Sequence, residues 1–282
     1  MILILKNADF SRNNIGNIPI TNPLTEETLR IMQSYSKFPA EQKNEYVQAL
    51  NSLIVGISDA GIYDKISVLA IPILASNIGE CSVNVKSGAR LENETYFKKL
   101  FALNERGELY RTAETFNDTT EHCGYAITHD SNDFMMFGVY DAGNGDTDAM
   151  AGAKIAGWYG FKNKLDFIET GPSGQVVVGG ANATPKGGGN EALLSAYGAV
   201  STAYVVSARS GEVYYKDKRA TRTGVYSADS ASLMMYYPLV TKGLYAQSNG
   251  SYLLYGCGYS LTEAETATLY SLLADFYNAV KA

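Results

Sequence analysis

Short runs of alternating apolar and polar residues fill the middle of the chain, and apolar residues recur every three or four positions on either side of it. Alternation predicts strands with one buried face, whereas the wider spacing predicts amphipathic helices. We therefore expect helices near both ends and antiparallel sheets between them. The expected strands are 96–103, 109–116, 122–128, 134–141, 155–161, 165–170, 175–179, 203–208, 212–216, 233–237 and 252–257.

The N-terminal part predicts a short apolar strand over 2–5 and then two helices. Thr25 is placed to cap the first helix. Pro39 suits the first turn of the second helix, and Gly61 predicts where that helix ends. The apolar residues that share one face of the second helix are Tyr46, Leu50, Leu53, Ile54 and Ile57.

A connector follows the second helix and leads into the apolar run 68–75. Pro72 lies within that run and favours an edge strand, a bulge or a segment that is not a strand. Cys81, Val83 and Val85 then alternate with polar residues, a pattern that predicts a further strand with one buried face.

The last helix is expected over 262–281. Thr262 and Glu265 have the spacing of a capping box. Leu269, Leu272, Leu273 and Phe276 line one of its faces, which we expect to pack against the sheets.

Glycine and asparagine in the turns and 21 tyrosines against one tryptophan fit half-buried strand faces, so the predicted fold is mainly β, a two-sheet sandwich. We divide the chain into an N-terminal strand and helical segment, 1–75, and a β-sandwich with its C-terminal helix, 76–282.

The formal charge of −6 argues against nucleic acid as a partner, because backbone binders need a clustered basic face. The basic residues Lys216, Lys218, Arg219 and Arg222 fall where we expect a hairpin turn. Lys6 interrupts the apolar start of the chain before an export signal would be complete. The uncharged run 66–79 is too short to cross a bilayer, so we expect a soluble chain with no membrane insertion.

Two segments resemble a module of tailed-bacteriophage virion proteins. The first runs from the second helix through Ala60-Gly61-Ile62-Tyr63-Asp64-Lys65-Ile66 into Val68-Leu69-Ala70. The other is Gly258-Tyr259-Ser260-Leu261-Thr262-Glu263-Ala264-Glu265 with the helix after it. The opening Leu5-Lys6-Asn7-Ala8-Asp9-Phe10-Ser11 is similar to the starts of virion proteins from gut Bacteroidetes phages. The resemblance covers about a quarter of the chain.

The resemblance implies a concanavalin A-like, or LamG-like, jelly roll between the two segments. It also implies a structural subunit of the virion, such as a head fibre, a capsid decoration protein or a tail fibre, assembled in the host cytoplasm. Expected partners are other virion proteins, further copies of this chain in a homo-oligomer, and a host-surface glycan. A lectin-like adhesin is the alternative, and a polysaccharide hydrolase is a third.

The best oxygen-rich loop contains Asp141, Asn144, Asp146 and Asp148, ligand types that Ca²⁺ prefers. A structural Ca²⁺ is thus the one cofactor considered, and none is otherwise expected. The alternative is a solvated Asn-Gly turn, which the missing glutamate of an EF-hand loop favours.

Trp158 and Tyr159 are candidates for a platform that stacks on sugar rings, although aromatic residues of a sandwich strand commonly fill its core. Catalytic patterns are missing. The Glu-x-Asp-x-x-Glu arrangement that supplies two carboxylates to a retaining glycosidase does not occur, and His122 and His129 accompany no nucleophile motif. We therefore expect a protein that is not an enzyme.

Overall fold

A computed structural model gives the fold. It describes residues 24–36, 44–90, 95, 97–98, 101–111, 124–129, 134–141, 154–160, 164–171, 175–179, 192–194, 203–209, 212–215, 218–221, 231–236 and 251–281.

An eight-stranded antiparallel sheet has the order β12-β11-β10-β5-β14-β3-β2, with β1 also paired to β14. β14 is central because β5 lies along one edge, whereas β3 and β1 share the other edge. Its strands are β1 (Ile66–Ala70), β2 (Phe101–Leu103), β3 (Leu109–Arg111), β5 (Phe134–Asp141), β10 (Ala203–Arg209), β11 (Glu212–Tyr215), β12 (Lys218–Thr221) and β14 (Ser251–Gly258).

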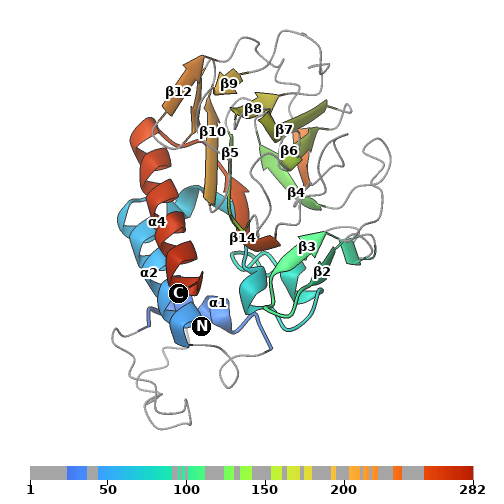
Figure 1. The fold of residues 1–282 in the computed structure, drawn as a ribbon, viewed down its shortest axis with the longest axis vertical. Coiled ribbons are helices and arrows are strands. Elements are labelled where there is room, and N and C mark those ends of the chain that lie inside the picture. Colours follow the sequence, from blue (N-terminus) through green and yellow to red (C-terminus); the bar gives the residue numbers. More distant parts are fainter. Residues whose placement is uncertain are drawn as a thin grey trace.

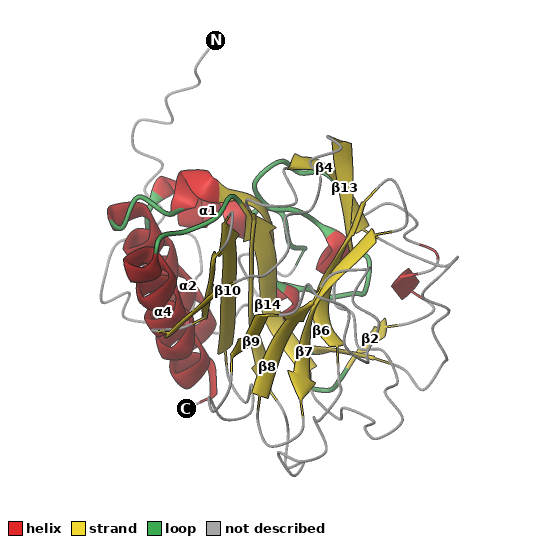
Figure 2. Cartoon of the chain, turned by 90° about the horizontal axis from the view of Figure 1, so that it is seen from above, coloured by secondary structure: helices red, strands yellow, loops and turns green. Residues whose placement is uncertain are grey.

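The second sheet has six antiparallel strands in the order β4-β13-β6-β7-β8-β9. These are β4 (Gly124–His129), β6 (Lys154–Gly160), β7 (Lys164–Gly171), β8 (Gln175–Gly179), β9 (Ala192–Leu194) and β13 (Ala231–Tyr236). Figure 2 shows a layer of helices beside the sheet that contains β10 and β14, with β6, β7 and β8 beyond it. The chain is thus rich in antiparallel sheet and consistent with a β-sandwich.

Most predicted strands are confirmed within a few residues, but two short ones were missed. β9 was not predicted, and neither was β12. The expected hairpin is confirmed, because β11 and β12 pair antiparallel with Tyr215 opposite Lys218, but Lys218 and Arg219 of the basic cluster belong to β12 itself. β12 is at the end of the strand order, and charged residues are common on edge strands because they discourage pairing with other chains.

Two other strand predictions were wrong in whole or in part. The strand expected over 96–103 is confirmed only at its end, as β2. Phe97 and Lys98 are helical, and the Phe97 ring lies 4.9 Å from that of Phe101 between ring centroids. Residues 80–82 form a 3₁₀ turn, and every residue from Cys81 to Val85 is buried, so the sequence alternation does not correspond to one buried and one exposed face.

Helices α1 (Glu26–Met32) and α2 (Asn44–Asp59) confirm the predicted N-terminal pair. Thr25 caps α1, since its hydroxyl oxygen accepts the Thr28 N–H at 3.1 Å. Pro39 lies outside the described residues. Gly61 has a φ of 67°, and its N–H and that of Ile62 bond back to the last turn of α2, a Schellman motif.

Helix α4 (Glu263–Lys281) confirms the predicted C-terminal helix and its capping box. It packs on α2 and on β10 (Figure 1). Leu50, Ile54, Leu269 and Leu273 are almost fully buried there and belong to the same core cluster as β1, β10 and β14. Burying such a side chain contributes about 1.5–3 kcal/mol.

The core cluster includes residues from both sides of the proposed division between 1–75 and 76–282. That division stays a prediction. Among the helices in the described ranges, none has both the length and the apolar character needed to span a bilayer.

Candidate attachment region

The two segments that carry the phage resemblance lie against each other, although nearly 200 residues separate them. Ile66 at the start of β1 pairs with Gly258 at the end of β14, and the Tyr259 N–H donates to the Lys65 carbonyl at 2.8 Å. A Cβ at Gly258 would overlap that carbonyl oxygen, so only glycine allows this approach. We call the region formed by α1, α2, α4 and the β1–β14 pair the attachment region.

An ion pair fixes the start of α4 to the turn after α2. Lys65 Nζ lies 2.7 and 2.8 Å from the two carboxylate oxygens of Glu265. Thr262 donates to the same carboxylate from its N–H at 2.8 Å. Burial opposes ionisation of Glu265, but the bonds from Lys65 and Thr262 outweigh it, so its pKa is lowered.

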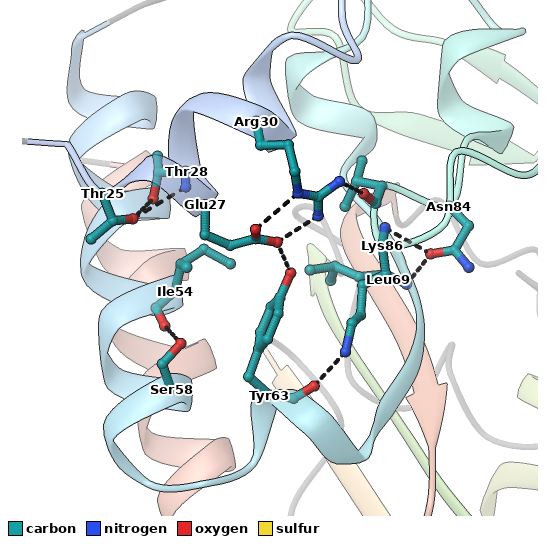
Figure 3. A network of polar contacts seen from close by, with 11 residues as sticks. Thr25, Glu27, Thr28, Arg30, Ile54, Ser58, Tyr63, Leu69, Asn84 and Lys86 are labelled. Atoms are coloured by element: carbon teal, nitrogen blue, oxygen red, sulfur yellow. Dashed lines mark hydrogen bonds and ion pairs between the residues drawn. The ribbon is translucent and has the colours of Figure 1, made fainter. Parts of the chain in front are cut away.

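Tyr63 of the same turn holds α1 in place (Figure 3). Its hydroxyl donates to Glu27, which also pairs with Arg30 one turn further along α1. The Lys86 ammonium donates to the Tyr63 carbonyl at 2.6 Å and lies 4.2 Å from the centre of its ring. Burial, followed by the bond to Glu27, raises the Tyr63 pKa, so the phenol keeps its proton.

Asn84 closes the outer edge of β1, as Figure 3 shows in part. Its amide oxygen accepts the Leu69 N–H at 3.1 Å, and its amide nitrogen donates to the Ser67 carbonyl at 3.0 Å. The Val85 N–H donates to the Leu69 carbonyl at 2.8 Å. These bonds take the place of those to a neighbouring strand. The Leu69 N–H and the Ser67 and Leu69 carbonyls are therefore not available to another strand.

The end of α4 is held by a second, more buried charge cluster. The Lys281 ammonium pairs with both Glu108, beside β3, and Asp141, the last residue of β5. Glu108 also accepts from the Ser251 hydroxyl and from the Asn104 amide at 2.9 Å. Burial opposes ionisation of Glu108, but the bonds from Lys281, Ser251 and Asn104 outweigh it and lower its pKa.

An open groove of about 450 Å³ runs between α2 and α4. Its floor is apolar and consists of Ala49, Leu53, Leu272 and Phe276. The rim is polar or small and consists of Glu45, Gln48, Ser52, Asp275 and Ala279. Residues early in α2 share the groove with residues late in α4, so the two helices run antiparallel.

Within the described residues, the Gln48 side-chain nitrogen is buried and has no hydrogen-bond partner. Nearly all such groups in folded proteins are paired with protein or with ordered water.

Of the four candidate Ca²⁺ ligands, only Asp141 belongs to the described residues. Asn144, Asp146 and Asp148 lie outside the described residues, so the loop itself is not tested. Asp141 is described, and its carboxylate pairs with Lys281. Among the described residues, no group of three or more histidine, cysteine, aspartate or glutamate side chains is arranged to hold a metal ion.

The candidate glycan platform falls on β6. Trp158 pairs in register with Met235 and with Asp166, and Tyr159 pairs with Met234 and Leu165. Its use as a sugar-stacking surface stays a prediction.

The groove and the Glu108–Lys281–Asp141 cluster were not predicted. Lys65 and Glu265 did lie in the segments that carry the phage resemblance. No pattern along the sequence marks Glu108 or Asn84, because partners such as Lys281 and Leu69 come from distant positions.

No protein-family model matches the sequence, and no curated protein matches it either. Solved structures with a distant likeness include Trypanosoma rangeli sialidase bound to the inhibitor DANA, at 12% identity and a TM-score of 0.37 over 83% of this chain and 39% of the sialidase. The covalent intermediate of that sialidase with 2,3-difluorosialic acid gives 12% identity and a TM-score of 0.36, over 81% and 39%. The receptor-binding domain of botulinum neurotoxin type G gives 7% identity and a TM-score of 0.28, over 74% of this chain and 51% of that domain.

The sialidases contradict our expectation that the chain is not an enzyme, and we withdraw that expectation. The motif search behind it tested paired carboxylates, whereas some glycosidase families use a tyrosine nucleophile. The chain spans 39% of the sialidases' length, and TM-scores this low support no specific reaction.

Proposed function

We propose that this chain is a structural subunit of a bacteriophage virion, of the head-fibre, decoration or tail-fibre type. In this proposal the attachment region packs on neighbouring virion proteins. The two sheets form a concanavalin A-like jelly roll that faces outward and adheres to host-surface glycans. Several copies assemble into a homo-oligomer.

One observation carries the proposal. The two segments that resemble the phage module, far apart in sequence, form a single unit through the β1–β14 pairing and the Lys65–Glu265 ion pair. Local turns of this kind occur singly by chance more easily than a pair of them that also meet in space. The joint placement therefore supports the view that both segments belong to one module.

Quantitative mass spectrometry of purified phage particles from the source tests this role. We expect a reproducible ratio of this protein to the major capsid protein. A high ratio indicates head decoration, and a ratio of a few copies per particle indicates a tail fibre. Absence from clean particles contradicts the proposal.

The purified chain is assayed in parallel for binding to a glycan array and for release of sialic acid from a sialylated oligosaccharide. Binding that is lost in Trp158→Ala supports the adhesive surface on β6. Release of sialic acid would assign an activity to the outward-facing sheets and would leave the virion ratio as the separate test of the structural role.

A further inference from the structure

We propose that the groove between α2 and α4 is the docking site for a cationic amphipathic helix of a neighbouring protein. The inference rests on the proposed function only for the expectation that this neighbour is a virion protein. Shape and charge argue for this occupant, and both are visible in the described residues.

The shape fits a third helix. About two turns of each helix border the groove, residues 45–53 of α2 and residues 272–279 of α4, and they run antiparallel. Its floor residues Ala49, Leu53 and Phe276 are nearly fully buried, whereas Ser52 and Ala279 on the rim are small and exposed. Small rim residues let a helix approach closely, and an apolar floor receives its apolar face.

Charge selects a basic partner. The charged residues of α2 and α4 are Glu45, Asp59, Glu263, Glu265, Asp275 and Lys281. Glu265 is occupied by Lys65, and Lys281 by Glu108 and Asp141. The four that remain are all acidic. Glu45 and Asp275 lie on the groove itself, on opposite walls.

No ion pair of either groove acid is present within the described part of the chain. A helix with an apolar face flanked by lysine or arginine would place positive charges against both walls. An acidic or neutral helix of the same shape would leave the two carboxylates uncompensated, so the groove discriminates by charge.

The test uses the full chain and a synthetic probe. The probe is a leucine–lysine peptide of about 18 residues, five helical turns. A control peptide carries glutamate in place of each lysine. Binding of both peptides is measured by isothermal titration calorimetry at physiological salt.

Three variants locate the binding. Ala279→Trp fills the groove from an exposed position and should weaken the lysine peptide by about tenfold or more. Glu45→Gln with Asp275→Asn removes both wall charges and should weaken it by about fivefold. Asp59→Asn with Glu263→Gln removes the same charge away from the groove and should leave affinity within about twofold. Far-UV circular dichroism and thermal melts confirm that each variant folds.

The proposal is overturned if the lysine peptide binds weakly or no better than the glutamate peptide. It is also overturned if the double variant at Glu45 and Asp275 loses no more affinity than the double variant at Asp59 and Glu263. Self-association that Ala279→Trp abolishes, without peptide binding, would assign the groove to a second copy of this chain and would also overturn it.

Particle mass spectrometry separates the two proposals. Peptide binding by a protein absent from virions contradicts only the virion role, and a stoichiometric virion protein that ignores the peptide contradicts only the groove.

Discussion

The two ends of α4 are fixed by charge clusters that differ in burial. At its start, the Lys65 side chain is 35% exposed and that of Glu265 is 23% exposed. At its end, the exposed fractions are 18% for Lys281, 4% for Glu108 and 16% for Asp141. An exposed pair is screened by water and adds little, whereas an uncompensated charge at a buried site is costly. The comparison therefore predicts that similar substitutions have unequal effects at the two ends.

The largest effect is expected for Lys281→Met. The change leaves the Glu108 and Asp141 carboxylates close together without their shared cation, and we expect the free energy of unfolding to fall by about 3 kcal/mol at neutral pH. Urea denaturation followed by circular dichroism measures it. Lys281→Arg keeps the charge and is the matched control, with a loss well below that of the methionine variant.

Lowering the pH should reduce the difference in free energy of unfolding between the wild type and Lys281→Met. In the wild type the Glu108 pKa is lowered, so its contribution is present above the unfolded pKa of about 4.3 and is lost as the pH falls through the lower folded value. In the variant, protonation relieves the repulsion between the two carboxylates instead. A difference in free energy of unfolding that stays constant from pH 7 to pH 3 would show that lost packing, not lost charge, causes the effect.

An intermediate effect is expected for Thr262→Ala at the other end of α4. The Thr262 hydroxyl oxygen accepts the Glu265 N–H at 3.3 Å, so its removal leaves one helix donor uncapped. We expect a loss of about 1 kcal/mol, measured by the same denaturation. Thr262→Ser retains the hydroxyl and should lose much less; an equal loss would point to the methyl group.

The smallest effect is expected for Glu265→Gln. Glutamine also suits the third position of a capping box, so the change removes the charge opposite Lys65 and preserves the cap. We expect the free energy of unfolding to fall by about 0.5 kcal/mol at low salt and by less in 1 M NaCl, where exposed charges are screened. A double-mutant cycle with Lys65→Met isolates the pair. A coupling as large as the loss in Lys281→Met would contradict the comparison.

Local signals made the helices predictable. Thr25, Gly61 and the Thr262–Glu265 pair act within one helical turn, and the structure confirms all three. The strand predicted through Val83 and Val85 failed because these residues are buried from both sides and Asn84 bonds to β1.

The charge clusters could not be predicted, since each joins residues far apart in the chain. Lys281 lies 173 positions from Glu108, and Lys65 lies 200 from Glu265. Such pairs follow from strand order, which periodicity does not give. The groove depends likewise on how α2 packs against α4.

The pairing of β1 with β14 has a consequence for synthesis of the protein. β1 ends at residue 70, and its partner strand β14 begins at residue 251, so β1 remains without this neighbour until residues 251–258 have been synthesised. Closing so long a loop is slow, because its entropy is lost before any contact compensates. During that interval the apolar strand needs protection from aggregation, and co-expressed chaperones should raise the yield of folded protein.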